Sequence, residues 1–413
     1  MRTLPSAFFT LVLSASLGVL LSIAFQPMPS RPVPPPFAAE IRDLALRFHG
    51  RPVLRGDPED GNAGECYRRA AFQLLSGGGD ELLAQLEKGK IPPGEDHCVW
   101  AEANREALAA MRRGTRRCGC ALLIDPNRGA DAAAPEAGIG PLLASVAVAE
   151  AIVASGEGKT PEAARILLDA ARFGQDLARG GGAIHRLWAC RVEFLALRWF
   201  VRLVGEGRLP SGSLRELRDE TDRLFAGAHP PGETLRTEAA FLLGELGVRR
   251  EADGGKAASG ADRDAVLDWL RRATDAAASG KGSPADAFAA VGRIAPAGDA
   301  SGSRVRTDFA LLADVERRTE ALRRASVLAV SLQILRRARG EFPERLEEAA
   351  LLRAGLPPDP FTGKPFEYRR HSPDSAALLC AGPDGMIDGD VEAPLGLQKE
   401  IRGDWIFRLA DKP

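Results

Sequence analysis

The order of helix, turn and strand signals in residues 321–409 constrains the fold of this chain more than any other feature. Apolar residues recur every three or four positions from Leu322 to Leu335, which predicts a helix with one buried face. Gly340 suits the left-handed residue that commonly follows a last helical turn, and Pro343 suits the first turn of a short second helix. The long helix therefore needs a partner surface, which the residues after it must supply.

That surface is predicted to be a small sheet. Residues 356–365 contain four prolines and one glycine, so neither a helix nor a strand continues through them. Residues 366–369 alternate apolar with charged side chains, residues 376–381 form an apolar run, and the turn composition of residues 372–374 joins the two into a hairpin. Residues 405–409 alternate again and predict a third strand. Three strands on one helix hold together, whereas an isolated hairpin is marginal.

Four motifs occur in order in this region. They are Gly340-Glu341-Phe342-Pro343-x-x-Leu346, Asp359-Pro360-Phe361-x-Gly363-x-Pro365-x-x-Tyr368, Gly382-Pro383-Asp384-Gly385 and Asp404-Trp405-Ile406-Phe407-Arg408-Leu409. The first three, following a helix, resemble the C-terminal half of the major pseudopilins of type II secretion. All four resemble more closely a set of uncharacterised single-span bacterial envelope proteins that append this module to a helical region. The resemblance covers the C-terminal quarter only, and it implies a long helix followed by a small antiparallel sheet.

The N-terminal segment predicts a membrane anchor. Residues 5–25 are almost entirely apolar, and their length is close to the roughly 20 residues that cross a bilayer, so we expect residues 1–25 to be a transmembrane anchor. A signal peptide cleaved before Phe25 is the alternative, because small residues precede that position. The proline-rich residues 26–37 predict a stiff spacer. We therefore expect a single-pass protein of the cell inner membrane with its bulk extracytoplasmic, or alternatively an exported soluble form.

Residues 38–305 predict an irregular helical bundle, because nearly every strong signal in them is helical. The densest apolar face lies in residues 184–204, so we expect this helix at the centre. Residues 250–260 and 279–302 are rich in Gly, Ala and Ser and predict flexible stretches. The fold class is thus mainly α, with a small α+β module over residues 306–413. The expected helices cover residues 64–75, 101–113, 142–155, 161–179, 184–204, 213–226, 233–246 and 261–278.

Four cysteines in the first part of the body carry a prediction of their own. Cys66, Cys98, Cys118 and Cys120 lie close in sequence, and outside the cytoplasm such clusters usually pair, so we expect at least one disulfide among them. The four allow three pairings, and the sequence leaves the pairing open. A metal site made of Cys98, Cys118 and Cys120 with the adjacent His97 is the alternative, although its spacing is not that of structural zinc.

Other candidate residues point to structural roles. His185 follows three glycines at the entry to the central helix, where it either lines a pocket or serves as a partly buried structural residue. Residues 156–160 have the end of a phosphate-binding loop, but the pattern lacks its first glycine and its strand, so we interpret them as a junction between two helices. Cys190 and Cys380 stand alone in apolar segments, which predicts buried free thiols.

One loop is rich in carboxylates. Asp384, Asp388 and Asp390 follow the turn at Gly382, and such oxygen-rich clusters bind Ca²⁺ in some proteins. Their spacing is not that of an EF-hand, so we expect weak or absent calcium binding, and we commit to no metal or cofactor.

These observations favour a non-enzymatic role. The chain has 55 basic and 56 acidic residues and no basic block, which argues against nucleic acid as a partner. No H-E-x-x-H or G-x-S-x-G motif is present, so we assign no catalytic residue. We expect a membrane-tethered envelope protein with a structural or partner-binding role and envelope protein partners. The alternatives are an extracytoplasmic enzyme that uses carboxylates of the helical body, and a calcium-binding module in the C-terminal loop.

Overall fold

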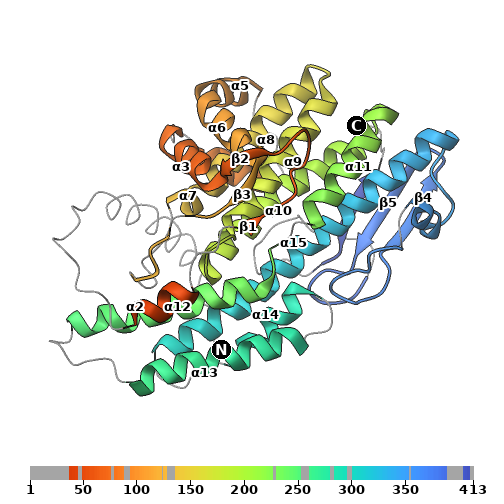
Figure 1. The fold of residues 1–413 in the computed structure, drawn as a ribbon. Helices are drawn as coiled ribbons and strands as arrows, with labels where there is room; N and C mark the ends of the chain where they lie inside the picture. The colour runs from red at the N-terminus through yellow and green to blue at the C-terminus, as the bar shows by residue number, and fades with distance from the viewer. Residues whose placement is uncertain are drawn as a thin grey trace.

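The computed structural model describes residues 37–44, 49–75, 79–87, 94–122, 124–127, 135–226, 229–252, 260–279, 283–294, 300–352, 355–387 and 403–409. In this part of the chain the protein is mainly helical, with a small antiparallel sheet near its C-terminus, so the predicted fold class is confirmed (Figure 1). The predicted anchor and spacer lie almost wholly outside the described residues. Among the described residues, no helix combines the length and the apolar composition that a bilayer crossing requires.

The helices, in chain order, are α2 (Ala38–Leu44), α3 (Ala63–Gln73), α4 (Gly79–Glu87), α5 (Gly94–Ala103), α6 (Arg105–Arg116), α7 (Pro135–Gly138), α8 (Gly140–Gly156), α9 (Thr160–Leu177), α10 (Ala183–Gly205), α11 (Ser211–Ala226), α12 (Pro231–Ala252), α13 (Gly260–Ser279), α14 (Pro284–Gly292), α15 (Ala300–Arg339) and the 3-10 helix η2 (Leu346–Leu352). The strands are β1 (His49–Gly50), β2 (Glu59–Asn62), β3 (Arg117–Cys120), β4 (Glu367–Ser372), β5 (Ser375–Cys380) and β6 (Trp405–Leu409). Each helix predicted between residues 64 and 278 is present, except that residues 101–113 belong to two helices that meet at Asn104. The short helix predicted to begin at Pro343 is instead the 3-10 helix η2, which begins at Leu346.

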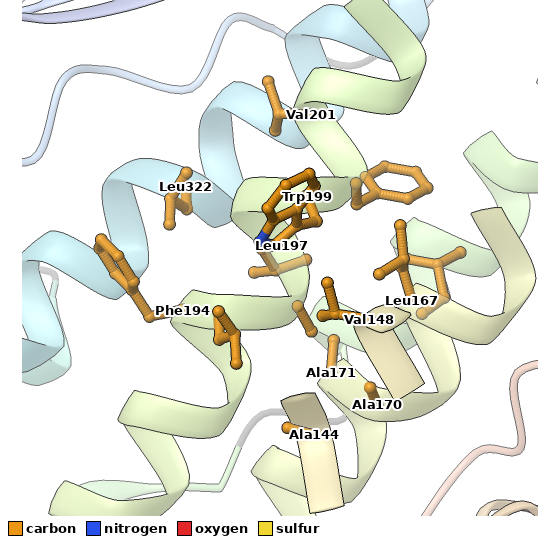
Figure 2. Close-up of a cluster of buried hydrophobic side chains, with 14 of the residues drawn as sticks. Ala144, Val148, Leu167, Ala170, Ala171, Phe194, Leu197, Trp199, Val201 and Leu322 are labelled. Carbon is orange, nitrogen blue, oxygen red and sulfur yellow. The ribbon is translucent and has the colours of Figure 1, made fainter. Parts of the chain in front are cut away.

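Helix α10 lies at the centre, as its apolar face predicted. It packs on α9 along one side and on α15 along the other, and it also contacts α8, α12 and β6. Helices α10 and α15 run parallel, because Arg186 pairs with Glu316 near one end and Gly205 accepts a hydrogen bond from Gln333 near the other. Figure 2 shows how side chains of α8, α9, α10 and α15 fill the space between these helices.

The interior holds two hydrophobic cores. The larger core joins α8, α9, α10 and the second half of α15, and it includes the C-terminal strands. The smaller core joins α2, α12, α13, α14 and the first half of α15, around Trp269, Phe288 and Phe309. Helix α14 lies within residues 279–302, whose composition predicts flexibility; its N-cap Ser283 and its buried Phe288 explain why it forms. Helix α15 is continuous across the predicted domain boundary at residue 306.

The C-terminal sheet has the strand order β4-β5-β6, so the predicted hairpin and third strand are confirmed. Strands β5 and β6 pack on α15, and β6 also packs on α10. A side chain at Gly205 would place its Cβ 2.4 Å from the carbonyl oxygen of Arg408, so glycine permits this close approach between α10 and β6. The sheet therefore packs on α10 and α15, which are also the long helices of the helical body.

The structure explains the Asp-Pro-Phe motif. Asp359 is buried, and its two carboxylate oxygens accept hydrogen bonds from the backbone amides of Phe361 and Ala381, at 2.7 and 2.8 Å. This carboxylate joins the irregular loop to the end of β5. The ring of Phe361 meets Trp405 of β6 edge-on, and Trp405 in turn meets Phe194 of α10. One aspartate and three aromatic rings thus connect the loop, the sheet and the central helix.

A second small sheet was not predicted. Strand β3 pairs antiparallel with β1 and parallel with β2, near the N-terminal end of the described chain. Its strands have only two to four residues and carry glycines and charges, so they show no apolar alternation. Asn62, the last residue of β2, caps α3 by accepting a hydrogen bond from the Gly64 amide at 3.0 Å.

Candidate functional site

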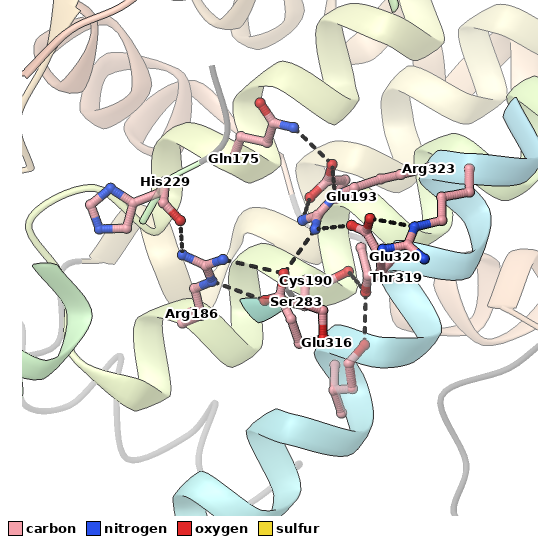
Figure 3. Close-up of polar contacts among 12 residues, drawn as sticks. Gln175, Arg186, Cys190, Glu193, His229, Ser283, Glu316, Thr319, Glu320 and Arg323 are labelled. Atoms are coloured by element: carbon pink, nitrogen blue, oxygen red, sulfur yellow. Dashed lines mark hydrogen bonds and ion pairs between the residues drawn. The ribbon is translucent and has the colours of Figure 1, made fainter. Parts of the chain in front are cut away.

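A layer of buried charged residues lies between α10 and α15, the two helices that contribute to both hydrophobic cores, and Figure 3 shows it. Arg186 and Glu193 reach it from α10, and Glu316 and Arg323 reach it from α15. All four side chains are almost completely buried. We call these four residues the ion-pair layer. Their spacing of seven residues on each helix is two helical turns, which places both charges of a helix on the face toward its neighbour.

Glu316 is the most heavily bonded member of the layer. Its carboxylate accepts hydrogen bonds from Arg186 at 2.9 and 3.2 Å and from Arg323 at 2.8 Å. The Cys190 thiol lies 3.1 Å from the same carboxylate and donates to it. Burial by itself raises the pKa of Glu316, but the two guanidinium groups outweigh it and hold that pKa well below its usual range. Glu316 is therefore a fixed anion at neutral pH.

Arg323 ties the layer together. It bonds both oxygens of Glu193, at 2.5 and 2.8 Å, while its other nitrogen reaches Glu316. Gln175 of α9 donates to Glu193 at 2.9 Å, so a third helix joins the network. Burial lowers the pKa of the Arg323 side chain, yet Glu193 and Glu316 more than reverse this and raise its pKa well above the ordinary value. The layer thus has two cations and two anions, all held by partners.

The layer borders a small cavity. The lining residues are Gln175, Ala178, Arg186, Ala189, Cys190, Glu193, His229 and Arg323. About 10 Å³ is open to the centre of a water molecule, which is the space that one water needs. Burial and the neighbouring Glu316 raise the pKa of the Cys190 thiol, so it stays protonated beside this cavity. The site can hold a hydrogen-bonded water, and its thiol is a poor nucleophile.

A second buried cluster lies one helix away, around Asp176 of α9. Its carboxylate forms ion pairs with Arg51 at 2.7 Å and with Arg179 at 3.3 Å, and it accepts a hydrogen bond from the Tyr67 hydroxyl at 2.5 Å. Arg172, also on α9, is fully buried and donates to the side-chain oxygen of Gln175 and to the backbone carbonyl oxygen of Arg223. Burial lowers its pKa to about 10. Gln175 therefore links this cluster to the ion-pair layer.

The glycines before α10 are required by close contacts. A Cβ at Gly181 would lie 2.3 Å from the Cβ of His185, and one at Gly182 would lie 2.4 Å from a carboxylate oxygen of Glu238. Glu238 of α12 accepts a hydrogen bond from the Ala183 amide at 2.8 Å, which satisfies the positive end of α10. Figure 3 shows the contacts of Arg186, which lies in the first turn of α10.

His185 does not line the cavity described above. It is buried and its ring lies beside that of Phe241, and burial lowers its pKa to about 4. Of the two roles considered for His185, its burial favours the structural residue over the pocket-lining one. Residues 156–160 join α8 to α9, with Gly158 in a left-handed conformation, as the interpretation of a helix junction requires.

The predicted disulfide is wrong in this structure, because all six cysteines are free thiols. Cys66 lies on α3 and Cys98 is exposed on α5, whereas the other two lie on β3. The sulfurs on β3 have different partners: Cys118 lies 4.0 Å from Asp60, and Cys120 lies 3.7 Å from the carbonyl oxygen of Asp176. Cys190 and Cys380 are buried free thiols, as predicted.

The alternative metal site does not assemble in the described part of the chain, where no group of three or more His, Cys, Asp or Glu residues is placed to hold an ion. Of the predicted calcium loop, Asp384 is described and accepts a hydrogen bond from the Met386 amide at 3.1 Å. Asp388 and Asp390 lie outside the described residues, so the calcium prediction stays a prediction.

The sequence did not reveal the ion-pair layer. Arg186, Glu193 and Arg323 read as charges on the polar face of a helix, and only the packing of α10 on α15 buries them. The sequence contained one relevant signal, which is the pair of charges spaced seven residues apart beside a wide apolar face. Such a helix can pack against two partners, and the second partner can bury the charges. No family model, curated protein sequence or solved structure matches this chain.

Proposed function

We propose that this protein is a non-enzymatic, membrane-tethered component of the cell envelope with a structural or partner-binding role. The tether is the apolar N-terminal segment, and the proline-rich residues after it form the spacer. The resemblance of the C-terminal quarter to the pseudopilin module supports an envelope location. The described body is then the part that meets other proteins.

The observation that carries this proposal is the parallel pair α10 and α15. These two helices contribute to both hydrophobic cores and support the C-terminal sheet, and the ion-pair layer fixes their register because Arg186 pairs with Glu316 and Glu193 pairs with Arg323 across the two helices. Buried ion pairs contribute little net stability compared with apolar packing, but in some proteins they specify one arrangement of helices. A chain whose buried ion pairs hold its helices in one arrangement is suited to a scaffold role.

The state of the carboxylates supports the same proposal over the enzyme alternative. A general acid or base needs a pKa near the working pH. Glu316 has its pKa held far below that range by Arg186 and Arg323, and Glu193 is bonded through both oxygens. Asp176 is likewise surrounded by donors. These buried carboxylates therefore act as structural anions.

The test is to compare a tethered form with a released form of the full body. In a deletion strain of the native host, one strain carries the full chain and the other carries residues 26–413 behind a cleavable export signal. We expect only the full chain to restore the envelope of the deletion strain, measured as resistance to detergents. The full chain should also remain in the membrane pellet after carbonate washing. Full rescue by the released form would favour an exported enzyme and contradict the proposal.

A further inference from the structure

Helix α2 is the first helix of the described chain, and in the sequence it directly follows the proline-rich residues. It is held by one apolar face. Phe37 just before the helix and Ile41 within it are 6% and 2% exposed in the smaller core, and Leu44 packs against that core. Figure 1 shows α2 lying against α12, the helix on which it packs.

Polar contacts add little to this attachment. Glu40 of α2 faces Arg263 of α13 at 3.5 Å, and both side chains are partly exposed. Ion pairs of this kind contribute little to stability. A helix of seven residues is also too short to be stable on its own. Helix α2 is therefore folded only while Phe37 and Ile41 are buried, so that its detachment and its unfolding are one event.

The smaller core can stay closed without α2. Most of its other members lie on α12, α13, α14 and α15, which follow one another in the chain and pack in that order. Its aromatic centre has Phe309 beside both Trp269 and Phe288, with ring centroids 6.2 and 5.9 Å apart. None of these three rings belongs to α2. Loss of α2 thus removes one edge of this core and leaves its centre in place.

The next described segment is fixed to a different part of the body. Arg51 pairs with Asp176 of α9 at 2.7 Å, and both side chains are fully buried. Leu54 lies in the larger core, and Arg55 pairs with one carboxylate on α9 and one on α11. Unfolding that begins at α2 therefore stops before Arg51, because to go further it must break a buried ion pair.

We propose that α2 is a releasable latch between the tether and the body, which detaches from α12 while the rest of the chain stays folded. Segments held by few apolar contacts open at free energies far below that of global unfolding. Fully extended, residues 37–44 reach about 26 Å, whereas the helix is about 10 Å long, so release lengthens the tether. The latch rests on the proposed function, because only a tethered chain has a connection to lengthen.

Hydrogen exchange of the full-length chain in a mild non-ionic detergent tests the latch. The Ile41 amide donates to the Phe37 carbonyl oxygen at 2.9 Å, so its exchange reports whether α2 is folded. Relative to the intrinsic rates, we expect it to exchange at least about 100-fold faster than the amides of Leu242 and Leu243 in α12. The segment from Arg51 to Leu54 should exchange slowly, as α12 does.

Two matched variants add a second readout. Ile41→Asp places a charge at a buried position and should release α2, whereas Ala39→Asp places the same side chain at an exposed position of the same helix. Trypsin reports the release, because it cuts after Arg42 only while the backbone there is unfolded. We expect cleavage after Arg42 to become at least about tenfold faster in Ile41→Asp and to change less than about twofold in Ala39→Asp.

Exchange in α2 as slow as in α12 overturns the inference, and so does equal tryptic cleavage in the two variants. It is also overturned if Ile41→Asp speeds exchange in α12, α13 and the segment from Arg51 to Leu54 as much as in α2, because α2 is then part of the cooperative body. If α2 fails these measurements while only the full chain restores the deletion strain, the latch falls and the proposed function stands. Full rescue by the released form removes the tether instead, whatever the exchange of α2.

Discussion

Replacing Glu316 by glutamine tests the ion-pair layer most directly. Glutamine keeps the size of the side chain but removes its charge, and the native carboxylate accepts four hydrogen bonds, from Arg186, Arg323 and Cys190. Arg323 then keeps Glu193 as a buried anionic partner, whereas Arg186 loses the carboxylate with which it pairs. Breaking a buried ion pair by changing one partner costs about 3 to 5 kcal/mol. We expect Glu316→Gln to lower the free energy of unfolding by about 3 kcal/mol, because the glutamine amide oxygen still accepts one hydrogen bond.

The assay is urea denaturation followed by circular dichroism, with the shift in midpoint as the readout. Glu320→Gln is the matched control, because Glu320 lies on the same helix one turn later and bonds Arg323 and Arg324 from a more exposed position. Exposed or partly exposed pairs contribute about 0 to 1 kcal/mol. An equal effect of the two substitutions, or a cost below about 1 kcal/mol for Glu316→Gln, would refute the reasoning.

The same substitution has a pH signature. The pKa of Glu316 in the folded chain lies well below its ordinary value of 4.5, so its stabilising effect is fully present above about pH 4.5. As the pH falls below that value, the unfolded chain takes up a proton at this position and the folded chain does not. The stability difference between the native protein and Glu316→Gln should therefore shrink by about 1.4 kcal/mol per pH unit below 4.5. A difference that stays constant down to pH 3 would contradict the assigned pKa direction.

Three further predictions concern other parts of the chain. Gly182→Ala places a Cβ 2.4 Å from a glutamate oxygen of α12 and should cost about 1 to 3 kcal/mol in thermal melts, whereas Gly212→Ala, with nothing within 4 Å, should be near neutral. Asp359→Ala leaves two backbone amides without their acceptor and should lower the melting temperature and expose the C-terminal sheet to protease; the exposed Asp374→Ala should do neither. Calcium should not raise the melting temperature, and a rise lost in Asp384→Ala would make the loop a metal site.

Much of the fold could be predicted from the sequence, because the signals that determine it involve residues close together in the chain. Gly340 takes the left-handed conformation that ends α15, with its amide bonded to the Arg336 carbonyl oxygen at 2.8 Å. Pro161 lies in the first turn of α9, where the missing amide hydrogen costs nothing. Alternation in residues 405–409 gave the third strand because one face of β6 is buried. Each of these features depends on residues that are neighbours in the chain.

The features that escaped prediction depend on contacts between distant segments. Strand β3 exists because Arg117 and Gly119 pair with β2, more than 50 residues earlier, and its own composition carries no strand signal. The disulfide predicted among Cys66, Cys98, Cys118 and Cys120 rested on closeness in sequence alone, and in the structure these cysteines lie on α3, α5 and β3 as free thiols. Cysteine chemistry depends on distance in space, which sequence spacing does not give.

The ion-pair layer shows why a candidate site of this kind is hidden in the sequence. Glu193 and Arg323 are 130 residues apart, and each lies in a helix where an isolated charge is expected to face solvent. The parallel packing of α10 on α15 buries them. The two helices pack together because each contributes apolar residues to both cores. A helix that serves two cores must cross the boundary between them, and the boundary is where buried charges can pair without interrupting either core. The charged residues therefore pair where two helices common to both cores pack together, and substitutions there should alter how α10 and α15 pack on each other.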